Sequence, residues 1–193
     1  DPIIDAEVIS LQYNILNALH INNLQVNINT LGDNESRLNY KDALVKYLEP
    51  HIDSLCEDCK ERLKTNPLRI LDCKVDKDSE ILKNAPTTLD YLNESSKERF
   101  EKLKEYLELM DIDYEIDTNL VRGLDYYNHT VFEIVADIPE FGNEAVLGGG
   151  GRYNGLIEQL DGPSTPAIGF AMGLDRTILA MEALGINFNI KND

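Results

Sequence analysis

Residues 130–172 decide the expected fold, and their sequence is TVFEIVADIPEFGNEAVLGGGGRYNGLIEQLDGPSTPAIGFAM. Three apolar runs in it have the length of β-strands, namely Thr130–Val135, Ala145–Leu147 and Ala167–Met172. Turn-forming Gly, Pro and Asn residues separate these runs, and they lack the intervening helices that parallel strands require. We therefore expect a largely antiparallel sheet.

The flanking segments extend this sheet. Tyr114–Ile116 adds a short strand before it, and a helix beginning at Asp175 follows it and ends at Gly185. Near the start of the chain, apolar residues at three- and four-residue steps predict a helix that Asp5 caps and that ends near residues 22–23. Alternating apolar and polar residues then predict a half-buried strand over residues 24–31.

Residues 33–110 differ from both flanks because they are highly charged and contain no glycine. Their apolar spacing predicts helices, interrupted at Pro50 and Pro67, and a capping box of Ser95 and Glu98 predicts the start of the last one. We expect an α+β fold in which residues 1–32 and 111–193 form a core around an all-helical insertion domain of residues 33–110.

Charge and hydropathy limit the classes of function. The chain has 193 residues, 42% of them hydrophobic, and a net charge of −17, which argues against a general nucleic-acid binder. It contains no apolar run of about 20 residues and no signal peptide, so we expect no membrane span and a cytoplasmic location. It begins at Asp1 rather than Met and its residues 187–193 are mostly polar, so we treat it as a possible fragment.

Basic residues are unevenly distributed. Residues 32–110 hold 14 of the 18, whereas residues 111–193 hold 14 acids and only four bases. Three of those four are Arg122, Arg152 and Arg176, and each lies beside or among glycines. Guanidinium groups suit carboxylates and phosphates, so the three arginine segments predict one anionic pocket on the sheet. The alternative is three structural salt bridges.

Two glycine-containing segments have open interpretations. Gly148–Gly151 lacks the sequence of a phosphate-binding loop and the spacing of a dinucleotide fold. It predicts either a strand against which a flat ligand lies, or a bulge or sharp bend. Gly173 leads a strand into a helix, which sets Arg176 at a helix N-terminus that favours anions.

The segment Leu120–Tyr127 joins an arginine to two aromatic residues. Tyr126 and Tyr127 can hydrogen-bond a polar ring or an amine, while Arg122 holds a carboxylate or phosphate. In the alternative interpretation, the tyrosines pack in the core and Arg122 pairs with Asp125. The residue types alone do not separate the two.

The cysteines Cys56, Cys59 and Cys73 suggest zinc, but the sequence supplies no fourth cysteine and no histidine at ligand spacing. Cys56 and Cys59 also fall on an apolar helical face, where buried thiols are common. We therefore predict core packing and no metal, with zinc as the less favoured alternative, requiring a ligand that the sequence does not place. An odd number of cysteines also argues against a disulfide framework.

Several motifs closely resemble histidyl-tRNA synthetase, a class II aminoacyl-tRNA synthetase of bacterial type. They are LVRGLDYY (residues 120–127), GGGRYNGL (149–156), GFAMGLDR (169–176), NPLRILDCK (66–74), NYKDAL (39–44) and IDAE (4–7). The likeness runs along nearly the whole chain but covers only the second half of the family's catalytic domain. It implies an antiparallel sheet that carries histidine and ATP, with residues 33–110 as the helical insertion near the tRNA acceptor arm.

The resemblance also implies roles for individual residues. Arg122 would bridge the histidine carboxylate and the α-phosphate as the catalytic group. Tyr126, Tyr127, Tyr153 and Gly150 would form the histidine pocket. Arg176, the arginine of the third class II motif, would bind ATP together with Gly173.

The implied reaction activates L-histidine with ATP and Mg²⁺, and then transfers the histidyl group to tRNA(His), in a homodimeric enzyme. The first two class II motifs and the anticodon-binding domain would lie outside this sequence, so we expect the fragment alone to be inactive. The main alternative is the histidine-sensing, synthetase-like regulatory subunit of ATP phosphoribosyltransferase. A plain interaction module, binding neither histidine nor ATP, is a third possibility.

Overall fold

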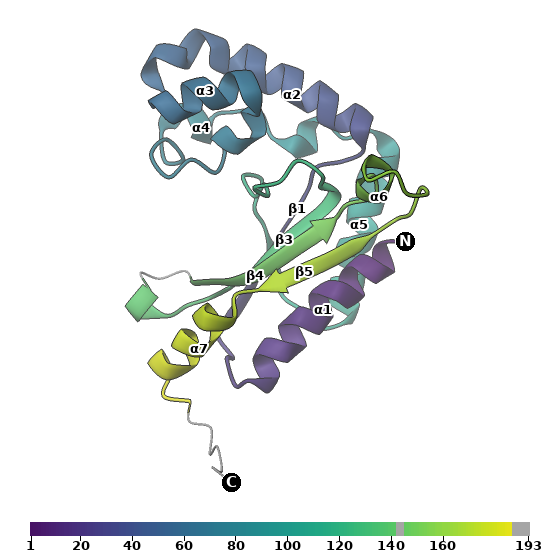
Figure 1. The fold of residues 1–193 in the computed structure, drawn as a ribbon, viewed down its shortest axis with the longest axis vertical. Helices are drawn as coiled ribbons and strands as arrows, with labels where there is room; N and C mark the ends of the chain where they lie inside the picture. The colour runs from purple at the N-terminus through teal and green to yellow at the C-terminus, as the bar shows by residue number, and fades with distance from the viewer. Residues whose placement is uncertain (142–144, 187–193) are drawn as a thin grey trace.

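Five strands form one sheet in the computed structural model, which describes residues 1–141 and 145–186 (Figure 1). The strand order is β2-β1-β3-β4-β5. The polar segment 187–193, noted above, lies outside the described residues. The strands are β1 (Leu24–Thr30), β2 (Tyr114–Ile116), β3 (Asn128–Ala136), β4 (Ala145–Arg152) and β5 (Ile168–Met172).

The pairing confirms a largely antiparallel sheet. Strand β3 pairs antiparallel with β1 and β4, and β4 pairs antiparallel with β5. Only the short edge strand β2 runs parallel to its neighbour, β1, among the described strands. Strand β4 is longer than expected because it continues through all four glycines to Arg152.

Seven α-helices accompany this sheet in the described part of the chain. They are α1 (Pro2–Ala18), α2 (Asn34–Leu48), α3 (Glu57–Thr65), α4 (Glu80–Lys83), α5 (Glu94–Leu109), α6 (Leu156–Gln159) and α7 (Leu174–Ala183). Short 3-10 helices lie at Glu49–Ser54, Pro67–Ile70, Thr88–Tyr91 and Pro139–Phe141. The prediction that residues 33–110 are mostly helical is confirmed, and Pro50 and Pro67 stand at the start of 3-10 turns.

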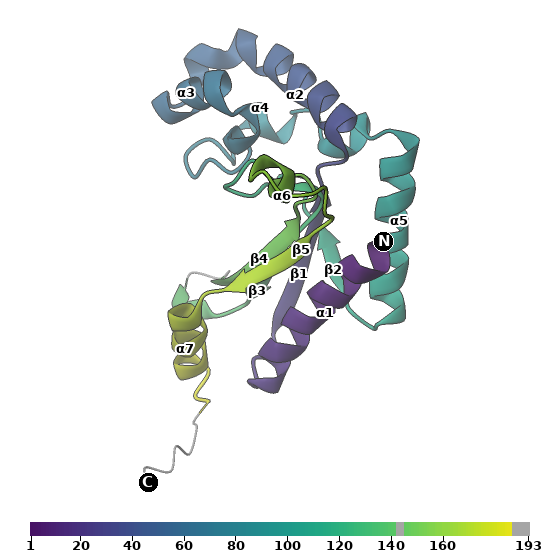
Figure 2. The same cartoon turned by 45° about the vertical axis from the view of Figure 1, so that its right-hand side comes forward.

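The two faces of the sheet have different neighbours. Helices α1 and α5 lie side by side and cover one face, where Ile28, Phe132 and Ile134 enter a fully buried core (Figure 2). Side chains alternate along a strand, so Val131 and Glu133 point to the other face. There Val131 packs with the loop that carries Leu120 and with the α2 and α3 helices. We call this second surface the open face.

Two predicted helix starts are wrong. Helix α1 begins one turn earlier, where the Asp1 side chain accepts a hydrogen bond from the Ile3 N–H, while Asp5 is buried inside the helix. Helix α1 also ends at Ala18, before the predicted boundary. Helix α5 is capped by Asn93 instead of the predicted Ser95–Glu98 box. Local patterns locate a helix well, but several nearby polar residues compete to cap it.

The end of α7 agrees with the sequence. The helix stops at Ala183, and Gly185 follows with a φ of +69°, a conformation that glycine adopts without strain. No helix within residues 1–141 and 145–186 combines the length and the apolar character needed to cross a bilayer. The division into domains at residues 32 and 110 stays a prediction.

Candidate functional site

An arginine and a glutamate form an ion pair on the open face of the sheet. Arg122 lies in the loop before β3, and its Nη1 donates to Glu133, which projects from the middle of β3. Both side chains are 23% exposed, so they are partly desolvated but reachable. Glu133 is paired across the sheet with Gly149 of β4. The pair therefore lies over the glycine run.

The glycines of β4 make room for this pair and for a tyrosine. A Cβ at Gly149 would lie 3.0 Å from the Arg122 Nη1, and a Cβ at Gly151 would lie 2.9 Å from the Tyr127 ring. Both distances are shorter than side chains normally tolerate. The run is part of strand β4, and side chains of Arg122 and Tyr127 lie close to the positions that Cβ atoms at Gly149 and Gly151 would take. That a ligand lies against this strand stays a prediction.

Gly150 has a different environment. By strand alternation its missing side chain would point to the face that α1 covers, and a Cβ there would meet the Gly169 carbonyl oxygen at 2.0 Å. Close approach of β5 thus requires glycine at this position. The predicted contact of Gly150 with histidine stays a prediction.

A buried amide fixes the loop that precedes Arg122. The Asn29 Nδ2 donates to the carbonyl oxygens of Thr118 (3.3 Å) and Leu120 (3.0 Å), and Asn29 itself is fully buried on β1. Its Oδ1 accepts from the backbone N–H of Thr30 at 2.8 Å. Because buried polar groups need partners, this network defines the path of the loop toward Arg122.

Electrostatics make the ion pair suited to a small zwitterion. Burial raises the pKa of Glu133, and the guanidinium of Arg122 only partly opposes this shift. The Nε of Arg122 is buried and has no hydrogen-bond partner among the described residues. The partly exposed guanidinium of Arg122 offers donors to an anion, while the neighbouring Glu133 offers an acceptor to an amine.

Three tyrosines gather next to this pair. The ring centroids of Tyr126 and Tyr127 are 4.6 Å apart, and that of Tyr153 lies 5.8 Å from Tyr126 and 6.2 Å from Tyr127. Tyr153 meets both rings edge-on, a favourable aromatic geometry. Burial raises the pKa of Tyr127 to about 12, so its hydroxyl stays protonated at neutral pH. The structure therefore brings the three predicted histidine-pocket tyrosines together.

Arg176 lies farther along β4. It is exposed in the first turn of α7, after Gly173, and its Nη1 donates to the Val146 carbonyl oxygen at 3.1 Å. Val146 precedes Gly149 by three residues, which is roughly 10 Å along a strand. Arg176 and Arg122 thus both lie against β4, at positions three residues apart along it.

Arg152 does not belong to an open anionic pocket. It is 4% exposed, and its Nε donates to the fully buried carboxylate of Asp5 at 2.9 Å. Thr130 and Arg99 also donate to that carboxylate, at 2.6 Å and 3.0 Å. The expectation of a shared pocket is wrong for Arg152, because a buried carboxylate needs compensating charge and takes it from this arginine.

Sequence reasoning missed two residues of the site. The alternative in which Arg122 pairs with Asp125 is wrong, because Asp125 contacts Asn66 and Arg37, and Arg122 pairs with Glu133. The signal for Glu133 was its position as the one acid within the apolar strand 130–135. No local pattern identified Asn29, because asparagine is usually exposed and only the tertiary structure buries it here.

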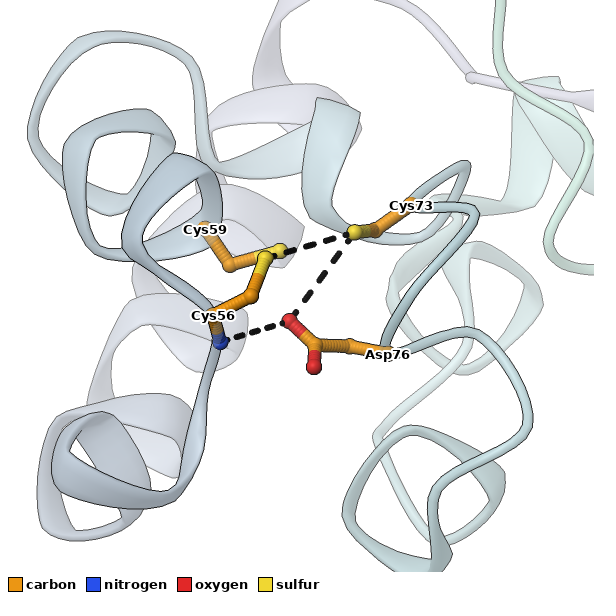
Figure 3. A group of neighbouring side chains, drawn as sticks. All are labelled: Cys56, Cys59, Cys73 and Asp76. Atoms are coloured by element: carbon orange, nitrogen blue, oxygen red, sulfur yellow. Dashed lines mark hydrogen bonds between the residues drawn. The ribbon is translucent and has the colours of Figure 1, made fainter.

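A separate group of side chains could hold a metal. The cysteines 56, 59 and 73 lie together with Asp76 near the start of α3 (Figure 3). Their ligand atoms all lie within 4.8 Å of one another.

A mostly antiparallel sheet that carries an arginine loop, a glycine strand and a final strand-to-helix arginine has the architecture of the class II aminoacyl-tRNA synthetase core. The family model for histidyl-tRNA synthetase matches residues 2–177. The chain belongs to the histidyl-tRNA synthetase family.

Individual relatives agree with this assignment. The chain is 55% identical to the histidine–tRNA ligase of Bacillus subtilis (strain 168) over 183 residues, covering 95% of this chain and 43% of that protein. It is 53% identical to the ligase of Geobacillus thermodenitrificans, covering 98% of this chain and 45% of that protein.

Solved structures give the same result. The apo S. aureus histidyl-tRNA synthetase superposes with a TM-score of 0.80 at 44% identity, covering all of this chain and 47% of that one. The chain therefore spans less than half the length of the relatives it matches.

Proposed function

We propose that these residues are the active-site half of a histidine–tRNA ligase. In the complete protein, L-histidine would react with ATP to give histidyl-adenylate and pyrophosphate, and the histidyl group would then pass to the 3′ end of tRNA(His). Such transfer needs orientation and charge stabilisation more than a covalent nucleophile. Mg²⁺ would accompany ATP and spread the phosphate charge.

The order of side chains along β4 carries the proposal. Arg176 binds at Val146, Arg122 lies over Gly149, and Tyr127 lies over Gly151. These positions are five residue steps apart in all, or roughly 17 Å of strand. An aminoacyl-adenylate is an elongated molecule with a base, a central phosphate and an amino acid, and this order supports one group for each part.

The roles of the residues follow from this order. Arg176, with Gly173 at the start of its helix, would bind ATP. Arg122 would bridge the α-phosphate and the histidine carboxylate, using donors that Glu133 leaves available. Tyr126, Tyr127 and Tyr153 would contact the imidazole and amino group of histidine, with the backbone of Gly150 alongside.

The remaining partners are also part of the proposal. The complete enzyme would be a cytoplasmic homodimer, with residues 33–110 as an insertion domain near the tRNA acceptor arm. Arg37 and Lys41 support that placement, because both line a pocket that also contains Asn66 and Asp125 at the border of the insertion and the Arg122 loop.

The regulatory-subunit alternative has weaker support. A structure described as an ATP phosphoribosyltransferase regulatory subunit/histidyl-tRNA synthetase from Bacillus halodurans superposes with a TM-score of 0.58 at 24% identity, which is a likeness of fold alone. Relatives above 50% identity carry the ligase name.

The test is histidine-dependent exchange of pyrophosphate into ATP by the complete protein that contains these residues, followed by charging of tRNA(His). The ligase predicts exchange with histidine, no exchange with leucine as the control amino acid, and charging when tRNA is added. Histidine binding without exchange would overturn the proposal in favour of the regulatory subunit. Binding of neither histidine nor ATP would leave an interaction module.

A further inference from the structure

Three sulfur atoms and one carboxylate oxygen converge in the helical segment, although they come from two separate stretches of chain. Cys56 and Cys59 stand at the first turn of α3, while Cys73 and Asp76 stand in the turns after the 3-10 helix Pro67–Ile70 (Figure 3). Figure 3 shows the four side chains pointing toward a common centre. The sequence offers only three cysteines, and tertiary structure supplies the fourth group.

The spacing fits one tetrahedral ion. Sulfur ligands at about 2.3 Å from zinc stand about 3.8 Å apart in a tetrahedron. The Cys56 and Cys73 sulfur atoms are 3.6 Å apart, and the Cys73 sulfur lies 3.9 Å from the Asp76 Oδ2. These distances are close to those between the ligands of a tetrahedral zinc ion, so the four side chains could bind zinc without movement of the backbone.

Burial favours a structural site over a catalytic one. Cys59 is fully buried, Cys73 is 3% exposed and Asp76 is 7% exposed, whereas Cys56 is partly exposed. Four protein ligands leave no open position for water or substrate, which is typical of structural zinc. The partly exposed Cys56 gives the ion a route of entry.

The surroundings hold the ligands in place. The Cys56 N–H donates to the Asp76 Oδ2 at 3.0 Å, which orients the carboxylate. The backbone at Cys73 is held by bonds from its N–H to the Ile70 carbonyl (3.0 Å) and from the Lys77 N–H to its own carbonyl (2.9 Å). Such outer contacts fix metal ligands before the metal arrives.

We propose that Cys56, Cys59, Cys73 and Asp76 bind one Zn²⁺ ion. Three thiolates and one carboxylate select a borderline-soft ion over Mg²⁺ or Ca²⁺, which prefer oxygen ligands. Binding displaces the three thiol protons to solvent and involves no change of oxidation state. The ion joins the start of α3 to the turns after residue 70.

This cross-link reaches the site on the sheet. Between the two ligand pairs lies Asn66, whose side chain contacts Asp125 in the Arg122 loop. Beside the second pair, Leu71 and Asp72 line a pocket together with Val121 and Glu133. Zinc would therefore position the segment against which the Arg122 loop packs.

The direct test measures zinc in the complete protein, purified under reducing conditions from zinc-supplemented cells. We expect one zinc per chain, retained on dialysis and released when a mercurial reagent modifies the thiols. Cys73→Ser and Asp76→Ala should lose the ion. Asp58→Asn, an exposed acid between the two α3 cysteines, is the matched control and should keep it.

Cobalt substitution tests the ligand set without relying on variants that fail to fold. The Co²⁺-loaded wild-type protein should show tetrahedral d–d bands and a sulfur-to-cobalt charge-transfer band, and the latter should fall by about a third in Cys56→Ser. Alkylation of the three thiols should slow with zinc bound and accelerate after chelation.

Three results would overturn the proposal. One is a reduced wild-type protein, with all three thiols free, that takes up neither Zn²⁺ nor Co²⁺. Another is zinc that stays bound in Cys73→Ser, which would mark an adventitious ion. The third is unchanged affinity in Asp76→Ala, which would remove the carboxylate from the site.

Discussion

Arg122 and Arg152 follow or adjoin glycines in the sequence, yet the structure gives them opposite environments. Arg152 points to the face that α1 covers, where its Nε donates to the buried carboxylate of Asp5, which also accepts from Thr130 and Arg99. Arg122 lies on the open face with one carboxylate partner and a buried Nε that has none among the described residues. A guanidinium whose donors are already paired holds the fold together, whereas one with unused donors can bind a ligand.

The largest expected effect is on the network around Asp5. Asp5→Asn removes the charge that compensates Arg152 in a fully buried place, so it should lower the free energy of unfolding by about 3–5 kcal/mol. Urea denaturation of the complete protein measures this. Glu7→Gln, an exposed acid on the same helix, is the control and should change it little. A loss below about 1 kcal/mol for Asp5→Asn would remove the distinction between the two arginines.

Arg122→Ala should lower the rate of the reaction instead of the stability of the fold. We expect pyrophosphate exchange to lose about 3 kcal/mol of transition-state stabilisation, or roughly a hundredfold in rate, as when one charge-stabilising donor is removed. The control is Arg69→Ala, an exposed arginine of the 3-10 helix Pro67–Ile70, which we expect to leave exchange unchanged because exchange does not require tRNA. Unchanged exchange in Arg122→Ala would place this arginine with Arg152 as a structural residue.

Tyr127→Phe should separate the two substrates. Loss of one hydroxyl contact should weaken histidine binding by about 1 kcal/mol, or about fivefold, while the affinity for ATP is kept. Isothermal titration with each substrate measures this, and Tyr106→Phe on the helix-covered side of the sheet is the control. Equal losses of histidine and ATP affinity would contradict the separate roles of Tyr127 and Arg176.

The smallest effect concerns pH. Burial, and then the nearby Arg99, lowers the pKa of His129 to about 4 from the ordinary 6.5. Between these two pH values His129 is protonated in the unfolded chain but not in the folded protein. The free energy of unfolding therefore falls as the pH drops from about 6.5 to about 4. His129→Asn should reduce the slope of the free energy of unfolding against pH by the equivalent of up to about one proton. Urea unfolding at several pH values measures this slope.

The matched control for that change is His20→Asn. His20 is exposed and shares the left-handed backbone of His129, with φ values of 64° and 48°. Asparagine tolerates that conformation at both positions. An identical pH slope in His129→Asn and wild type would show that His129 does not titrate differently in the folded protein.

Local pattern predicted most of the fold. Alternation and turn residues identified the strands of the antiparallel sheet, and helical spacing identified the segment between β1 and β2, because these signals depend on neighbours in the sequence. The errors were at boundaries. Asp5 is of a residue type that often caps helices. In the structure it lies inside α1, where its carboxylate accepts a hydrogen bond from the buried Arg152.

The site was predicted less completely. The sequence identified Arg122 and the three tyrosines through their motifs, and the structure brings the tyrosines together. It did not identify Glu133 as the partner of Arg122, because the register of β3 against β4, which sets Glu133 over Gly149, is not visible in a local pattern.

The sequence by itself determined the family, the segments of secondary structure and the candidate functional residues, since motifs and periodicity lie within short stretches of chain. Only the tertiary structure decided which of those residues lie in contact with one another. It joined Asp5 to Arg152, Arg122 to Glu133, and Asp76 to the three cysteines. The physical reason is that buried charges and thiols must find partners, and the packing of distant segments determines which partners are within reach.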